Sequence, residues 1–216
     1  MEVAHYGTNK PTSLQEVVER FNISAGTVAV DIETVSLEDR TPIGIGFALT
    51  PTDAYYFPID SLHIPLHVLE NPSITKVFHN GHFDLKVLDD ALGVSVTNYV
   101  DTIIAARLLG FPPRLGDLAQ QLVDINIPTI ESLIGKRGND QLTMDKVPVE
   151  KVAEKCCLDV EASLAIWELL KDRLPKAAFD LEIRVMPVVM AIEDAGMFID
   201  QQRLEEHIQR LERNVS

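Results

Sequence analysis

Three strand patterns in the first sixty residues restrict the fold more than any other feature of this sequence. TVAVDIE at 27–33 alternates and is rich in β-branched residues, and IGIGFAL at 43–49 and AYYFPI at 54–59 follow it. Consecutive strands joined by polar turns pair as an antiparallel meander. The sequence therefore predicts that the domain opens with an antiparallel sheet of about three strands.

The middle of the chain alternates between strand and helix patterns. Strand patterns at 74–79 and 94–100 are each followed by a helix pattern, and residues 149–174 predict one long helix. Gly93 is placed to end the first of these helices and Asp101 to cap the start of the next. This order predicts an α/β fold with a mixed central sheet of about five strands flanked by helices.

After Pro175 the sequence predicts helices alone. The first should kink at Pro187 and end at Gly196. The second has apolar residues at spacings of four, three and four, which form a one-sided stripe that needs a partner surface. This stripe consists of Leu204, Ile208, Leu211 and Val215.

The chain carries 33 acidic and 19 basic residues, a formal net charge of −14. Counterion release needs clustered Lys and Arg, so this charge argues against a protein that holds nucleic acid through basic patches. The sequence has no apolar run long enough for a transmembrane helix, and its start has no basic residues followed by an apolar run, as a secretory signal would. These features predict an intracellular chain with no membrane partner. The adjacent cysteines, Cys156 and Cys157, fit neither a CxxC metal site nor a disulfide framework.

Two carboxylates lie at the end of the first strand pattern. Asp31 and Glu33 are two residues apart, so the period of a strand puts both side chains on the same face. Neighbouring like charges repel, which makes this pair a poor stabiliser of a sheet. A solvated strand face is the alternative for a single DxE pattern, but the preceding VAV is typical of a buried strand.

Two predicted helices supply further carboxylates. Asp84 follows Asn80 by four residues at the start of one helix, and Asp159 borders the apolar stripe of the long helix. Taken singly, Asn80 is equally suited to cap its helix, Asp84 to face the helix dipole, and Asp159 to lie at the surface. Together with the strand pair, the aspartates supply four hard oxygen ligands, which can hold two divalent ions, Mg²⁺ or Mn²⁺, for phosphodiester cleavage.

The order DIE, NGHFD and LDVE resembles the three exonuclease motifs of the DEDD superfamily of ribonuclease H-like 3'-5' exonucleases. More closely, it resembles the proofreading domain of family A DNA polymerases of the bacterial polymerase I type. The likeness extends through VAVDIETVSLEDRTPIGIGFAL, KVFHNGHFDLKVL, DTIIAARLLG and GNDQLTMDKV, and the tail LEIRVMPVVMAIEDAGMFIDQQRL is similar to the start of the polymerase domain. The resemblance implies an exonuclease domain over 1–175 and the truncated start of a polymerase-type helical domain over 176–216.

The resemblance also implies roles for individual residues. Leu37 would wedge against the terminal bases, and Asn80 and Phe83 would line the substrate groove. A leucine wedge and an aromatic ring suit a single-stranded DNA 3' end, because stacking does not depend on base sequence. The implied metal ligands are Asp31, Glu33, Asp84 and Asp159.

One position departs from the family pattern. Four residues before the last aspartate the family has a tyrosine, or in relatives a histidine one position nearer or further, that orients the attacking water. This chain has Lys155 there, and AEKCCLD contains no Tyr or His. A lysine near several carboxylates stays protonated and is a poor general base, although it could donate to a metal-bound water or to a phosphate oxygen. An ion pair with Asp159 at i, i+4 is the alternative. We therefore expect a site that is active but slowed.

Three functions are compatible with these features. The leading one is a monomeric 3'-5' proofreading exonuclease acting on DNA in a bacterial or virus-infected cytoplasm, with a polymerase domain in the same or a separate chain. The second is an RNA 3'-end exonuclease that resembles ribonuclease D. The third is a catalytically silent exonuclease-like scaffold for a polymerase, which only Lys155 favours.

Overall fold

A mixed sheet forms the centre of the protein. The computed structural model describes residues 4–7, 13–138 and 140–215. Within these residues the sheet has six strands in the order β1-β4-β3-β2-β5-β6. The strands are β1 (Ala4–Gly7), β2 (Gly26–Thr34), β3 (Pro42–Thr50), β4 (Asp53–Pro58), β5 (Ile74–Phe78) and β6 (Tyr99–Asp101).

The pairing confirms the predicted mixed sheet. β2, β3 and β4 form the expected antiparallel meander, with Asp31 opposite Gly46, and β5 and β6 add in parallel beside β2. The short edge strand β1 pairs with β4 and was not predicted. The strand expected at 94–100 is shorter than predicted and begins only at Tyr99, because Asn98 has a positive φ of 47° that interrupts the extended chain.

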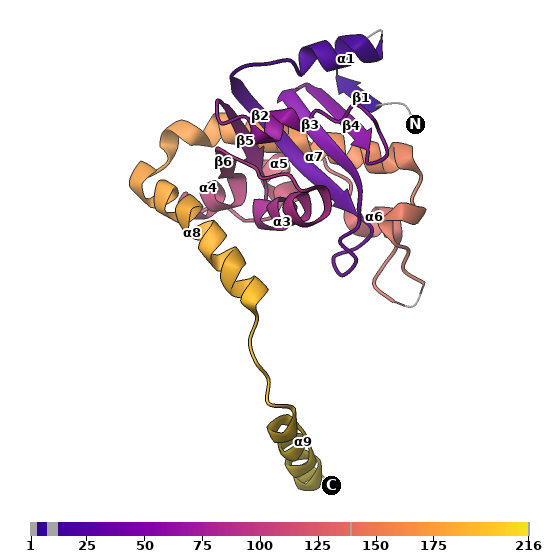
Figure 1. Cartoon of the computed structure of the whole chain (residues 1–216), viewed down its shortest axis with the longest axis vertical. Helices are drawn as coiled ribbons and strands as arrows, with labels where there is room; N and C mark the ends of the chain where they lie inside the picture. The colour runs from indigo at the N-terminus through magenta and orange to yellow at the C-terminus, as the bar shows by residue number, and fades with distance from the viewer. Residues whose placement is uncertain (1–3, 8–12, 139, 216) are drawn as a thin grey trace.

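The sheet lies between helices on both faces (Figure 1). The predicted caps are confirmed: Gly93 ends α3 in the left-handed conformation, and the Asp101 side chain accepts from the Ile103 N–H at the start of α4. The helices are α1 (Leu14–Arg20), α2 (His67–Glu70), α3 (Gly81–Leu92), α4 (Thr102–Leu108), α5 (Leu115–Val123), α6 (Ile130–Ile134), α7 (Val149–Leu170), α8 (Lys176–Ala195) and α9 (Gln201–Val215). Two short 3-10 turns cover Met144–Lys146 and Lys171–Arg173.

Different side chains fill the two faces of the sheet. On the face covered by α1, α2 and α3, the Phe21 ring packs edge-on against Phe47 and Tyr55, with ring centroids 5.4 and 5.2 Å apart. On the opposite face, small residues such as Ala29 and Ala48 contact α7. The long helix therefore lies close to the sheet.

Gly46 permits a close approach of α7 to the sheet. A Cβ atom at this position would lie 2.5 Å from the Cys156 sulfur, well inside van der Waals contact. Because Gly46 is opposite Asp31 in the β2–β3 register, the approach occurs beside the strand carboxylates. The packing of α7 thus determines the geometry of the site.

The C-terminal helices differ in their packing. α8 contacts α3 and α4, buries Phe179 and Met186, and continues through Pro187. α9 lies away from the sheet beyond an extended segment, as Figure 1 shows, and its Leu204, Ile208 and Leu211 are exposed. The Val215 side chain lies outside the described residues. Among the described helices, none is both long and apolar enough to cross a membrane.

Candidate active site

β2 presents two carboxylates to α7, as its alternation predicts. Val30 and Ile32 point into the core on the α3 side, whereas Asp31 and Glu33 contact residues of α7 on the other side. β5 pairs with β2 only from Gly26 to Ala29. The end of β2 that carries the carboxylates therefore extends beyond its parallel neighbour.

Asp84 occupies the edge of β2 that β5 leaves open. β5 ends at Phe78, and Asn80, with φ 66°, turns the chain into α3. The Asp84 Oδ1 then accepts a hydrogen bond from the Ile32 N–H at 2.9 Å. A buried backbone N–H needs such a partner, so this bond fixes Asp84 beside the two strand carboxylates.

Asp101 supports this arrangement from β6. Its buried carboxylate accepts from the backbone N–H groups of Asn80 at 3.1 Å and Gly81 at 2.8 Å, in addition to capping α4. The sequence predicts only the cap. The second role joins the start of α3 to β6 and was missed because it depends on strand order.

Lys155 and Asp159 come from α7, one turn apart. The Lys155 Nζ lies 2.5 Å from the Asp159 Oδ2, so the alternative of an i, i+4 ion pair is confirmed. The same ammonium lies 2.9 Å from the Glu33 Oε1, 122 residues away in the sequence. Burial lowers the pKa of Lys155, but the attraction of Asp159 and Glu33 outweighs it and holds the pKa well above its ordinary value. Lys155 is therefore a permanent cation in this site.

Cys156, for which the sequence predicted neither a metal-binding nor a disulfide role, is a neighbour of the site. Its Sγ lies 3.5 Å from the Asp31 Oδ2. Burial raises the pKa of this thiol well above its ordinary value, and the charges of Asp31 and Glu33 raise it further. The thiol thus stays protonated and donates to Asp31. Cys156 lies three residues before Asp159, on the same face of the helix. This spacing was the signal in the sequence that could have placed Cys156 beside the carboxylates.

The carboxylates interact electrostatically. Burial, followed by repulsion from Glu33, Asp84 and Asp159, raises the pKa of Asp31 well above its ordinary value. Burial likewise raises the pKa of Asp84 to about 8, although the Ile32 N–H opposes the shift. Asp31, Glu33 and Asp159 thus share the ammonium of Lys155, and the negative charge that remains, together with that of Asp84, suits a hard divalent cation. Carboxylate oxygens of Asp31 and Glu33 lie within 4.8 Å of each other, close enough to hold one ion; the Cys156 sulfur lies equally near, but as a protonated thiol it is a poor ligand for a hard ion.

The three predicted substrate residues lie on two neighbouring segments. Leu37 is 76% exposed in the β2–β3 loop. Asn80 is exposed at the start of α3, and its side chain makes no capping bond. Phe83 is partly buried, and the Arg40 guanidinium of the β2–β3 loop lies 5.5 Å from its ring centroid, which joins this loop to α3. The roles of these residues toward a substrate stay predictions.

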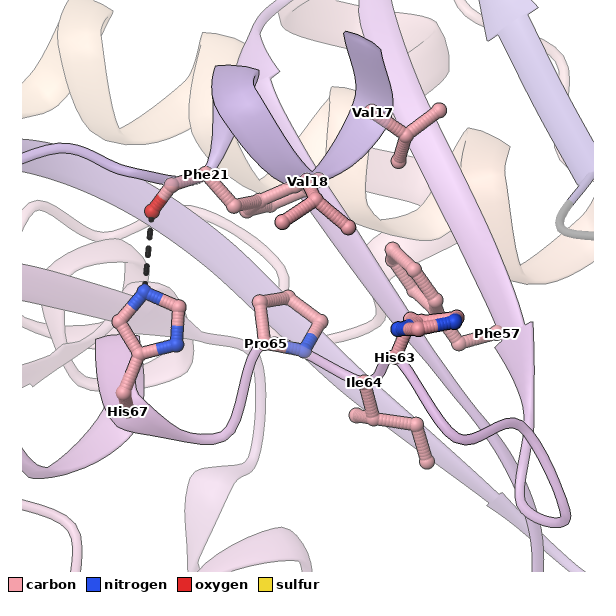
Figure 2. Close-up of a pocket in the computed structure, with 8 residues that line it drawn as sticks. All are labelled: Val17, Val18, Phe21, Phe57, His63, Ile64, Pro65 and His67. Atoms are coloured by element: carbon pink, nitrogen blue, oxygen red, sulfur yellow. Dashed lines mark hydrogen bonds between the residues drawn. The ribbon is translucent and has the colours of Figure 1, made fainter. Parts of the chain in front are cut away.

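A shallow pocket on another part of the molecule is separate from the carboxylates. It has a volume of about 160 Å³ and lies between α1 and the segment after β4 (Figure 2). The His67 Nε2 and the Phe21 carbonyl oxygen, 3.1 Å apart, tie the two segments together. The pocket is lined by Val17, Val18, Phe21, Phe57, His63, Ile64, Pro65 and His67. None of these residues carries a carboxylate, so the pocket is not the candidate active site.

Comparisons with known proteins agree with this geometry. Residues 8–175 match a family of family A DNA polymerase domains described as 3'-5' exonuclease. DNA polymerase I of Chloroflexus aurantiacus is 34% identical over 217 aligned positions, covering 90% of this chain but 23% of the longer protein. The chain therefore spans about a quarter of the length of this relative.

Solved structures of related shape include exonucleases. Brucella melitensis NrnC superposes with a TM-score of 0.64 at 23% identity, covering 83% of this chain and 89% of that one. NrnC has also been solved with bound Mg²⁺. Escherichia coli RNase D, an exoribonuclease, gives a TM-score of 0.62 at 24% identity over 81% of this chain and 47% of that one. These likenesses confirm the ribonuclease H-like exonuclease fold, and the family match shows that the chain belongs to the 3'-5' exonuclease domains of family A DNA polymerases.

Proposed function

We propose that this chain removes nucleotides from the 3' end of single-stranded or mispaired DNA by metal-dependent hydrolysis, as a proofreading exonuclease. The convergence of four acidic side chains from β2, α3 and α7 carries the proposal. The relationship to a DNA polymerase I supports DNA as the substrate. The carboxylates are Asp31, Glu33, Asp84 and Asp159.

These carboxylates would hold divalent ions, two in the complete site, with Mg²⁺ or Mn²⁺ as the metal. Bound ions of this kind supply an activated water and a positive charge beside the leaving oxygen. The residues of the chain bind and orient the strand end. Leu37 would separate the terminal bases, and Asn80 and Phe83 would line the groove that receives them.

Lys155 would slow the reaction without abolishing it. Its ammonium cannot accept a proton from the attacking water, because its pKa lies above the ordinary value. It can still donate to a phosphate oxygen if its bonds to Glu33 and Asp159 break. The buried ion pair also supports a second candidate, a silent exonuclease-like scaffold for a polymerase.

One assay separates these candidates. Oligonucleotides of DNA and RNA, labelled at the 5' or the 3' end, are incubated with the protein in Mg²⁺ or EDTA. We expect Mg²⁺-dependent shortening of DNA from its 3' end, and its loss in the Asp31→Ala, Glu33→Ala double variant. Preferential cleavage of RNA would favour a ribonuclease D-type activity, and no metal-dependent cleavage at all would favour the scaffold.

We also propose that residues 176–216 begin a polymerase-type helical domain. The exposed apolar side chains Leu204, Ile208 and Leu211 on α9 support this assignment, because such a stripe is stabilised by a partner surface. The partner would be a polymerase domain, in the same chain or in another, inside a bacterial or virus-infected bacterial cell. A polymerase domain that leaves α9 accessible to protease would contradict this assignment.

A further inference from the structure

Lys155 occupies the gap between two of the proposed metal ligands. Its Nζ lies 2.9 Å from one oxygen of Glu33 and 2.5 Å from one oxygen of Asp159. Its side chain is 10% exposed, and those of Glu33 and Asp159 are 8% and 9% exposed. The ammonium is thus enclosed with both carboxylates rather than solvated beside them.

The other two carboxylates have neutral donors instead. Asp31 accepts from the Cys156 thiol, and Asp84 accepts from the Ile32 N–H. A Mg²⁺ ion shared by Glu33 and Asp159 would bind at about 2.0 to 2.1 Å from their oxygens, in the gap that the ammonium fills. The ammonium and such an ion would then lie within a few ångström of each other, where their repulsion is strong.

We infer that Lys155 is a built-in counter-ion that takes the place of one divalent ion in the free protein. The inference rests on the proposed function for the identity of the ligands. The free chain then binds one divalent ion, held by Asp31 and Asp84. The ion between Glu33 and Asp159 binds only when the ammonium of Lys155 is displaced from both carboxylates.

The number of bound ions tests this inference without any measurement of cleavage. Binding of Mn²⁺ to the full chain is counted by calorimetry and by the electron paramagnetic resonance signal of the free ion. We expect one ion per wild-type chain and two per Lys155→Met chain, with the second ion at least tenfold weaker in the wild type. Lys155→Arg keeps the cation and should bind one.

A matched control lies one turn earlier on the same helix. Lys151 is exposed, and Lys151→Met changes the net charge equally while leaving the carboxylates untouched, so this variant should bind one ion. Circular dichroism verifies the folding of each variant, and Lys155→Gln replaces Lys155→Met if the latter does not fold.

Two ions bound equally well by wild type and Lys155→Met would overturn the inference, as would one ion in both. If the wild type binds two ions as tightly as Lys155→Met does and still degrades DNA, the proposed function survives and the inference fails. If neither protein binds an ion, both fail.

Discussion

Replacement of Gly46 tests whether the approach of α7 to the sheet sets the active site. A Cβ atom at Gly46 would lie 2.5 Å from the Cys156 sulfur, about 1 Å inside an ordinary contact of about 3.5 Å. Both residues are buried between α7 and the sheet, so the overlap is relieved by turning the Cys156 sulfur away from Asp31 or by moving the helix. We expect Gly46→Ala to lower the free energy of unfolding by about 1 to 3 kcal/mol.

A shift of the helix should also slow cleavage. Asp159 and Lys155 move with α7, whereas Asp31 and Glu33 stay on β2. A misplacement of about 1 Å between reacting groups can reduce a rate by about a hundredfold. Urea unfolding followed by circular dichroism, and the rate of Mg²⁺-dependent shortening of a 5'-labelled oligonucleotide, measure the two effects.

Two further variants make the test specific. Cys156→Ala removes the sulfur that the new methyl group would meet, so the double variant with Gly46→Ala should recover most of the lost stability, as coupled neighbours do. Gly116→Ala is the control, because a Cβ atom there meets nothing within 4 Å. Unchanged unfolding and cleavage in Gly46→Ala would refute the reasoning.

Three other changes have definite expected results. Lys155→Tyr should cleave DNA faster than the wild type in a gel assay, because it frees Glu33 and Asp159 from the ammonium and supplies the tyrosine that we expect to orient the attacking water; an equal or slower rate would contradict this. Burial lowers the pKa of His79 from an ordinary value of 6.5 to about 4, so only the unfolded chain takes up its proton as the pH falls below 6.5. About 2 kcal/mol of stability should be lost by pH 5, and His79→Gln should flatten this dependence in urea titrations. Deleting the chain after α8 should leave the melting temperature unchanged. Deleting α8 as well exposes the packing sites of Phe179 and Met186, which should lower the free energy of unfolding by about 3 kcal/mol or more. Equal melting temperatures of the two shortened chains would show that α8 packs only weakly.

Local patterns in the sequence were sufficient to predict much of the fold. The alternation around Asp31 and Glu33 fixed both their strand and their shared face, since a period of two leaves no other arrangement. Strand β6 was predicted too long because a positive φ at Asn98 is not visible in the apolar pattern.

Contacts across the fold could not be predicted in the same way. The pair Lys155 and Asp159 was visible at i, i+4, but the bond from Lys155 to Glu33 joins elements far apart in the chain. Cys156 is similar: its helix position is local information, whereas its contact with Asp31 depends on how closely α7 packs on β3. The packing distance in turn depends on Gly46, which carries no chemical signal of its own.

The ion pairs of Lys155 connect the stability of the protein to its capacity for metal. Burial and mutual repulsion raise the pKa of Asp31, Asp84 and Asp159, so the ionised carboxylates destabilise the folded chain in the absence of a cation. A fixed ammonium relieves part of this repulsion whether or not metal is present. With a tyrosine at the same position, only bound metal ions would reduce the repulsion between the carboxylates. The stability of the fold would then depend more strongly on metal concentration. Lys155 therefore exchanges some metal affinity for a fold that is less dependent on metal.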